Sequence, residues 1–356
     1  MRGLARYVAA ELAIVASALV GVGVVSTRVT TVLVHQWEER VERERAEANA
    51  LPPHGEISDP PDLAITDEVA GTFLGMSDDL LLERVRRQPI VRVKLNKGGS
   101  SLSFRVDLAD GSRAAFKPAQ TNFQTIPRKE VAAYRLNRLL GLNAVAPAAP
   151  RMISRDELLA NLHPETLAAA PRIRAETLFN PLGKTAGVIM YWIPEIKESG
   201  LDTPVGQAQG AQWLTVGVPI VPEKRPLAAQ LSDLVVFDFL ISNPDRYSGG
   251  NMKMSADGTH LYFMDNTMAF FLDPTGNDKT RPALQRTQRF SRHLYQALDR
   301  VSVVGLQQEL AAEKDSPYEI LTAAEMRAIV ARRDVVKKHI DGLIAMYGEP
   351  NVLLFP

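Results

Sequence analysis

The sequence predicts an α+β protein with two lobes, a small β-rich lobe followed by a larger helical one. The first observation is a group of strand-like runs between residues 90 and 193 that encloses one amphipathic helix. The second is the mainly helical pattern from Leu227 onward, broken by a loop-rich block between residues 242 and 274. The third is that 356 residues with 46% apolar content can bury a sizeable core. This order of elements suits two lobes with a cleft between them.

Residues 1–35 predict a membrane anchor. Their uncharged stretch, residues 12–27, is slightly shorter than the roughly 17–25 residues that span a bilayer. A helix still spans if Glu11 and Arg28 extend to the two interfaces. A cleaved signal peptide and a buried soluble helix are the alternatives, and the lack of a clear cleavage site favours the anchor. The expectation is a single-pass membrane protein, with the side that holds the lobes left open.

Residues 36–64 connect this segment to the lobes. Residues 37–48 read WEERVERERAEA, a charged pattern typical of a solvated stalk, through which two copies of the chain could also form a homodimer. Residues 51–62 contain four prolines, which disfavour helix and sheet and indicate a linker. We therefore place the first lobe at residues 65–195 and the second at residues 196–356.

Apolar periodicity predicts four strands and one helix in the first lobe. The strands show alternating or continuous apolar residues and cover residues 90–95, 102–108, 113–117 and 188–193. A turn at residues 109–111 joins the second strand to the third as a hairpin. The helix covers residues 128–140, and Gly141 provides its C-terminal stop.

Gly98 and Gly99 lie between the first two strands, within the segment KGGSS at residues 97–101. Glycines at such a place let backbone N–H groups approach an anion closely. A plain turn explains the same residues equally well. On their own, the two glycines are weak evidence for a phosphate-binding loop.

Lys117 ends the third strand, and Glu130 comes early in the following helix. In kinases, a strand lysine paired with a helix glutamate holds the α- and β-phosphates of ATP, because the ion pair fixes the ammonium group in place. Each residue has an ordinary alternative. A strand-end lysine can extend into solvent, and a glutamate in a first helical turn favours the helix dipole. The acidic residues of the second lobe favour the kinase interpretation.

Two aspartates follow apolar runs in the second lobe. Asp245 lies in an Asn-x-Asp-Arg loop after an apolar helix, where a carboxylate can accept the proton of a substrate hydroxyl. Asp265 ends an apolar strand, as does the Mg²⁺ ligand of phosphoryl-transfer sites. Asn251 follows Asp245 one residue further along than the asparagine that supplies a second metal ligand in protein kinases. Ordinary turn aspartates are the alternative, which the order of the two acids disfavours.

These motifs resemble the catalytic region of the secretory-pathway kinases of the Golgi casein kinase type. The matching residues are FKP at 116–118, KEVAAYRLNRLLGL at 129–142, FDFLISNPDR at 237–246 and MDN at 264–266. Bacterial HipA-like kinases and phosphoinositide kinases share a looser version. The resemblance covers about residues 91–347 and implies a two-lobed protein-kinase-like fold.

The resemblance also implies a role for each candidate residue. The residues it implies for ATP binding are Gly98, Gly99, Lys117 and Glu130. The residue it implies for acid–base catalysis is Asp245, and the implied metal ligand is Asp265, with Asn251 as the further candidate metal ligand from the protein-kinase loop asparagine. The implied cofactors are ATP with Mg²⁺ or Mn²⁺, and residues 188–193 would lead into the adenine-binding hinge.

The sequence therefore predicts an ATP- and metal-dependent kinase that phosphorylates a protein serine or threonine, or a sugar hydroxyl. One alternative is a nucleotide-binding pseudokinase or scaffold at the membrane. It is favoured by Tyr247, which replaces the histidine usual after Asp-Arg, and by the offset of Asn251. The other alternative is an adenylyltransferase, since the same cleft can present ATP in another orientation.

Composition excludes several other classes. Without cysteine there are no disulfides, thiolate nucleophiles or cysteine-ligated metal sites. The formal net charge of +0 gives no argument for nucleic acid as a partner. The six histidines are scattered, without the spacing of metal ligands.

Overall fold

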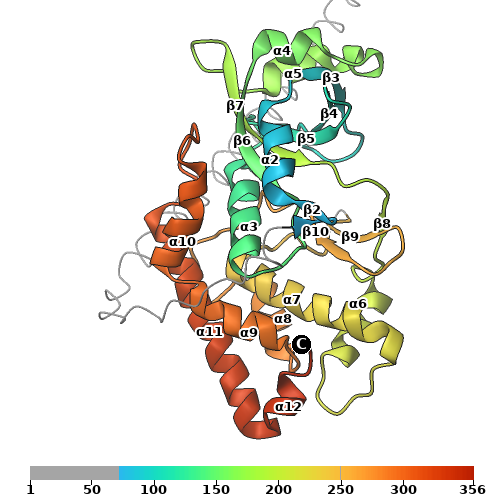
Figure 1. Cartoon of the computed structure of the whole chain (residues 1–356), viewed down its shortest axis with the longest axis vertical. Coiled ribbons are helices and arrows are strands. Elements are labelled where there is room, and N and C mark those ends of the chain that lie inside the picture. The colour runs from blue at the N-terminus through green and yellow to red at the C-terminus, as the bar shows by residue number, and fades with distance from the viewer. Residues whose placement is uncertain (1–71, 249) are drawn as a thin grey trace, which may run out of the picture. The chain divides into compact units, whose positions relative to one another are not determined.

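The computed structural model describes residues 72–248 and 250–356. In this part of the chain a sheet-bearing lobe precedes a helical lobe, which confirms the predicted mixed fold class (Figure 1). The predicted anchor at residues 1–35 and the stalk and linker at residues 36–64 lie outside the described residues. The lobe boundary at residues 195 and 196 stays a prediction.

The prediction of a single-pass membrane protein is corrected. Within the described ranges, no helix is both long enough and apolar enough to cross a bilayer. Helix α11 (Ala323–Tyr347) has the length, with 25 residues, but charged residues occur along it. The segment on which the prediction rested lies outside the described residues.

The first lobe is built on a five-stranded antiparallel sheet. Its strands, in spatial order, are β3 (Ile90–Leu95), β4 (Phe104–Leu108), β5 (Arg113–Pro118), β7 (Lys184–Tyr191) and β6 (Ala148–Ser154). The strand expected at residues 188–193 corresponds to β7, which starts and ends earlier than expected. Strand β6 pairs with it along the whole of β6, from Ser154 with Lys184 to Ala148 with Met190. Strand β6 was not predicted, since Pro150 interrupts its pattern. An edge strand tolerates that proline.

Strand β5 occupies the middle of this sheet and points its side chains alternately to the two faces. Phe116 is fully buried on one face, while Ala115 and Lys117 point to the other. The neighbouring strand approaches closely at Gly187. A Cβ added there would lie 2.6 Å from the Lys117 carbonyl oxygen and 2.7 Å from the Phe116 ring. Glycine at this position therefore helps to set where Lys117 sits.

Helices α2 (Asp78–Arg87) and α3 (Arg128–Leu139) pack against β6 and β7. The small hairpin β1 (Thr72–Phe73) and β2 (Met76–Ser77) precedes α2. The remaining elements of this lobe lie near β3 and β6, at the top of Figure 1, and are α4 (Arg155–Ala160), η1 (Pro164–Ala169) and α5 (Ala170–Glu176). The helix predicted at residues 128–140 thus corresponds to α3.

Helix α7 (Arg225–Ile241) forms the centre of the second lobe. Its last eight residues are all buried, as expected for a helix that is apolar on nearly every side. Ser242 ends it in a left-handed conformation with φ of 51°. The helices around it are α6 (Pro204–Trp213), α8 (Thr280–Arg286), α9 (Arg292–Ala297), α10 (Val303–Leu310), α11 and α12 (Glu349–Val352), with 3₁₀ turns η2 (Pro222–Lys224), η3 (Leu298–Arg300) and η4 (Ala311–Glu313).

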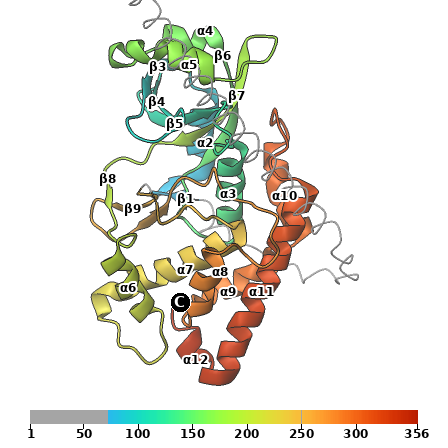
Figure 2. The ribbon, with the colours of Figure 1, turned by 180° about the vertical axis from the view of Figure 1, so that it is seen from behind.

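The loop-rich block after α7 contains two short strands that were not predicted as a pair. Strands β9 (Met252–Ser255) and β10 (Leu261–Phe263) form an antiparallel sheet with β8 (Ile196–Glu198). Helices α10 and α11 run alongside α3 in both views (Figures 1 and 2). Helix α3 therefore has the candidate cleft on one side and the C-terminal helices on another.

Candidate functional site

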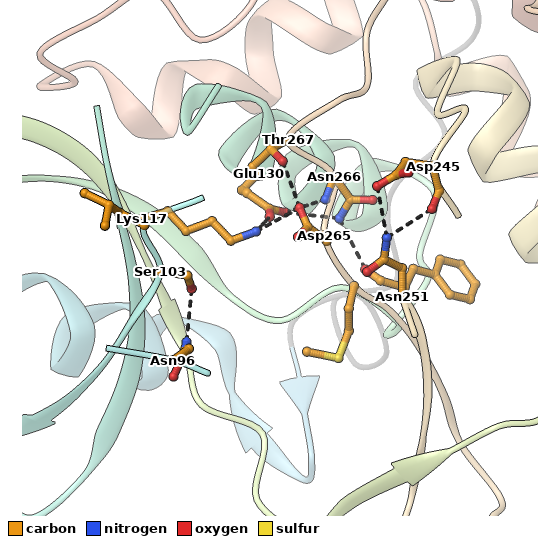
Figure 3. A network of polar contacts seen from close by, with 12 residues as sticks. Asn96, Ser103, Lys117, Glu130, Asp245, Asn251, Asp265, Asn266 and Thr267 are labelled. Atoms are coloured by element: carbon orange, nitrogen blue, oxygen red, sulfur yellow. Dashed lines mark hydrogen bonds and ion pairs between the residues drawn. The ribbon is translucent and has the colours of Figure 1, made fainter. Parts of the chain in front are cut away.

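Lys117 is the centre of a polar cluster drawn from both lobes. Its Nζ lies 2.8 Å from Glu130 Oε1 and 2.8 Å from Asp265 Oδ1. Strand β5, helix α3 and the turn after β10 supply these three side chains (Figure 3). The side chains of Lys117 and Glu130 are 9% and 3% exposed, whereas Asp265 is 40% exposed. The open end of the cluster is thus the aspartate.

Interactions between opposite charges determine the direction in which the pKa values of Lys117 and Asp265 shift. Burial alone would lower the pKa of Lys117, but the carboxylates of Glu130 and Asp265 outweigh it and raise that pKa above its ordinary value. Partial burial works to raise the pKa of Asp265, but Lys117 and hydrogen bonding to Thr267 lower it. Lys117 and Asp265 are therefore both charged at neutral pH.

Asp265 adopts a backbone conformation that disfavours most residues. Its φ is 53°, in the left-handed region, which aspartate tolerates better than most side chains do. The hydroxyl of Thr267 donates to Asp265 Oδ1 at 2.8 Å, so this oxygen is contacted by both Thr267 and Lys117. Backbone strain of this kind is concentrated at functional sites.

Asp245 and Asn251 come together despite the unusual spacing between them. Asn251 Nδ2 donates to the Asp245 carbonyl oxygen at 3.0 Å and to Oδ2 at 3.3 Å. The Ser248 hydroxyl donates to Asp245 Oδ1, and Asp245 N donates to Asn243 Oδ1 at 3.0 Å. Because Asn251 uses its amide nitrogen on Asp245, its carbonyl oxygen points away from that residue.

Arg246 connects this loop to the rest of the site, and sequence reasoning gave it no role. It is 1% exposed and makes bidentate contacts to Asp238, with Nη2 2.9 Å from Oδ1. Burial raises the pKa of Asp238, an effect that Arg246 opposes. The same guanidinium donates to the carbonyl oxygens of Asn251 (3.1 Å) and Met264. Its place directly after Asp245 in the Asp-Arg pair was the available signal.

Asn266 belongs to the MDN motif at residues 264–266, and in the structure it lies between Glu130 and Arg246. Its backbone N and its Nδ2 lie 3.1 Å and 3.2 Å from Glu130 Oε2. Its Oδ1 accepts from Arg246 Nη2 at 2.6 Å. Figure 3 shows Lys117 and Asp245 on opposite sides, with Asp265 and Asn266 between them.

A cavity of about 240 Å³ opens beside this cluster. The polar end is formed by Lys117, Glu130, Asp265, Asn266 and Asn251. The remaining walls are mostly apolar and include Ala115, Val145, Ala146, Met190, Ile193 and Phe263. A pocket with apolar walls and a few charged groups at one end is typical of small-molecule sites.

The glycine segment at residues 97–101 has open space around its two glycines. Gly98 and Gly99 have φ of 90° and 79°, and no neighbouring atom lies within 4 Å of a Cβ added at either. Neither lines the cavity, whereas Asn96 and Ser103, on the two sides of the same loop, do. Asn96 Nδ2 donates to Ser103 Oγ at 3.0 Å and closes the base of the loop. A phosphate-covering role for the glycines stays a prediction.

The available metal donors are few. Among the described residues, no group of three or more His, Cys, Asp or Glu side chains is placed to hold a metal ion. Two oxygen donors at the polar end of the cavity are the partly exposed Asp265 carboxylate and the amide oxygen of Asn251. Two oxygen donors suit Mg²⁺ or Mn²⁺ when phosphate oxygens and water complete the coordination.

Comparison with known proteins identifies the fold. No family model matches the sequence, and no curated protein matches it. The solved Golgi casein kinase with Mn and ADP bound matches at a TM-score of 0.62 and 18% identity, over 78% of each chain. Hydra Fam20, solved with sugar, matches at 0.60 and 20% identity, over 76% of this chain and 90% of that chain. The chain therefore shares the kinase-like fold of the proteins that its motifs resemble.

Proposed function

We propose that this protein is an ATP- and metal-dependent kinase that transfers the γ-phosphoryl group to a hydroxyl of a protein or a sugar. The observation that carries the proposal is Lys117 joined to both Glu130 and Asp265 at 2.8 Å. Three separate elements supply these residues, and Asp245 lies in the same polar network. In kinases, that arrangement of lysine and two acids positions the phosphates of ATP.

The cavity supports a nucleotide as the ligand. Its apolar walls, which include the chain from Met190 to Ile193, suit a purine, and its charged end suits phosphates. The kinase of similar fold was solved with Mn and ADP, and this likeness supports the same class of ligand here. We assign the phosphates to Lys117 and the metal to Asp265 and Asn251. A bound divalent ion would bridge phosphate oxygens and neutralise developing charge.

The side chains of this protein would divide the transfer step between them. Lys117, held by Glu130, aligns the nucleotide phosphates. Asp245 Oδ1 accepts the proton of the acceptor hydroxyl. The hydroxyl oxygen bonds to the γ-phosphorus, and the bond from that phosphorus to the bridging oxygen breaks, so ADP leaves. The Ser248 hydroxyl donates to Asp245 Oδ1, so an acceptor hydroxyl would displace it. Asn251 holds the other carboxylate oxygen and fixes the orientation of Asp245.

Intact-mass analysis tests the proposal. The full-length protein is incubated with ATP and Mn²⁺, and with either serine- and threonine-containing peptides or oligosaccharides. A product heavier by one phosphate, absent for Asp265→Ala protein of unchanged melting temperature, is expected. A product heavier by one AMP would replace the kinase assignment with adenylyl transfer. ATP binding without any product from either acceptor class would favour the pseudokinase instead.

A further inference from the structure

Asn266 is nearly inaccessible, with 1% of its surface exposed, and every polar atom of its side chain is used. Its Nδ2 donates to Glu130 Oε2 and to the Phe263 carbonyl oxygen, both at 3.2 Å. Its Oδ1 accepts from Arg246 Nη2. One amide therefore connects the glutamate of helix α3 with the arginine that follows Asp245.

The two partners dictate which way this amide points. Arginine can only donate hydrogen bonds, and an ionised carboxylate can only accept them. The oxygen of Asn266 must therefore face Arg246, and its nitrogen must face Glu130. A carboxylate at this position would repel Glu130, and an apolar side chain would satisfy neither partner. An amide of this length is the side chain that joins them.

The contact with Asn266 also determines how Glu130 meets Lys117. The two oxygens of the Glu130 carboxylate are divided, with Oε2 bound to Asn266 and Oε1 bound to Lys117. The contacts on the two oxygens together orient the plane of the carboxylate, and hence the direction from which Lys117 is held. Arg246, in turn, is anchored on the buried Asp238. A continuous chain of contacts thus runs from helix α7 to the lysine.

We propose that Asn266 is a positioning residue that couples the Asp245 loop to Lys117, by holding Glu130 in the orientation that aligns Lys117 for the nucleotide phosphates. The inference rests on the proposed nucleotide site. It adds a residue at the polar end of the cavity that acts on the nucleotide phosphates through Glu130 and Lys117. A purely structural role for Asn266 would instead affect the whole protein and every ligand alike.

Comparing three ligands separates these two roles. For Asn266→Ala, the Kd of ATP and of ADP is expected to rise about tenfold, the size of one lost hydrogen bond to a charged group. The Kd of adenosine, which has no phosphate for Lys117 to hold, is expected to stay unchanged. The backbone N–H of Asn266 still reaches Glu130, which limits the loss. An equal rise for adenosine and ADP would overturn the proposal.

Asn161→Ala is the matched control. Asn161 also donates two side-chain hydrogen bonds to partners within the protein, at 3.1 Å to Ile90 O and 2.9 Å to Glu157 O. It does not line the cavity. Its removal is expected to lower the melting temperature and to leave the affinities for ATP, ADP and adenosine unchanged.

A second measurement needs no nucleotide. Acetylation of Lys117 by acetic anhydride, relative to the exposed Lys279, is measured by peptide mapping of the full-length protein. We expect the relative rate to increase several-fold in Asn266→Ala and not in Asn161→Ala, because a loosened Glu130 holds Lys117 less firmly. If the rate does not change, the coupling is wrong. If it increases while wild-type protein binds no ATP, the coupling stands and the proposed function fails.

Discussion

Buried charged residues lie on two sides of helix α3, and the two sides have different roles. Toward the cleft, the helix presents Glu130, which shares its carboxylate between Lys117 and Asn266. Toward helices α10 and α11 it presents three arginines, Arg128, Arg135 and Arg138, whose helical spacing brings them to one face. Both sides are ionic and largely buried. They differ in whether a ligand could replace one of the partners.

On the arginine side, every partner belongs to the protein. Arg128 meets Glu325 through two bonds of 2.7 and 2.8 Å. Arg135 contacts Glu313, and it lies 3.2 Å from Glu309. The Thr322–Glu325 capping box fixes Glu325 at the start of α11. These contacts hold the helix in position whether or not a ligand is bound.

On the cleft side, the partner of Lys117 at the open end is a partly exposed aspartate. In the proposed function, phosphate groups would take the place of Asp265 beside Lys117, and the metal would take the place of Lys117 beside Asp265. Under the proposed function, the same kind of ion pair stabilises the fold on one face of the helix and prepares a ligand site on the other. Substitutions on the two faces should therefore separate activity from stability.

The largest effect is expected from Asp245→Asn. Removing the proton acceptor should lower kcat for phosphoryl transfer about 10³-fold, since general-base catalysis typically contributes that much. The Kd of ATP should not change, because Asp245 does not line the cavity. Steady-state kinetics together with calorimetric binding measure both quantities. Equal transfer rates in the variant and the wild type would remove Asp245 from the mechanism.

Lys117→Met should affect both properties and so sharpens the comparison. The Kd of ATP is expected to rise about 30-fold with the loss of a charged phosphate contact. The variant also leaves the buried Glu130 without its cation, so the free energy of unfolding should fall by about 3 kcal/mol. Calorimetric titration and urea denaturation give the two numbers. An unchanged ATP affinity would show that the lysine does not contact phosphate.

Glu313→Ala tests the side of helix α3 that carries the arginines. Glu313 pairs with Arg135 and Arg86 and has only 4% of its side chain exposed, so its loss leaves buried charge uncompensated. We expect the free energy of unfolding to fall by about 3 kcal/mol, with the ATP affinity of the folded protein unchanged. Glu176→Ala, which breaks the exposed pair with Arg172, should cost less than about 0.5 kcal/mol. Loss of ATP affinity in Glu313→Ala at low temperature would break the separation of the two faces.

The smallest expected effect is a change in how the free energy of unfolding depends on pH in the acid range. Burial works to raise the pKa of Glu325, but the hydrogen bonds from Arg128 outweigh it and lower that pKa below its ordinary value of 4.5. The resulting stabilisation is complete above about pH 4.5 and is lost as the pH falls through the lower folded-state value. Glu325→Gln should therefore be less stable than wild type at pH 7 and show a shallower loss of stability toward pH 3. Parallel pH profiles would contradict the assignment.

The pairing of Lys117 with Glu130 could be predicted from the kinase pattern of a strand lysine and a helix glutamate, taken together with the acidic residues of the second lobe. Asn251 was harder, since its spacing from Asp245 depends on the path of the loop. The junction at Asn266 could not be predicted. Its role arises from contacts with Glu130 and Arg246, which lie far from it or across a loop in the sequence.

Two other features also depended on tertiary structure. Pro150 interrupts the strand-like sequence pattern of β6, so the sequence did not predict this strand. In the structure β6 is an edge strand that pairs with β7. The glycines at residues 98 and 99 suggested the loop over the phosphates, yet the residues that line the cavity there are Asn96 and Ser103. Which side of a loop faces a cavity depends on strand register, and glycine content does not specify it.

Calorimetric titration of ATP into the full-length protein, with and without Mn²⁺, tests the central claim most directly, for wild type beside Asp265→Ala. The account predicts that wild type binds ATP more tightly when Mn²⁺ is present, and that Asp265→Ala loses this metal-dependent gain while remaining folded. No binding by wild type at millimolar ATP, or an unchanged metal effect in the variant, would contradict the assignment of this cleft as a nucleotide site for phosphoryl transfer.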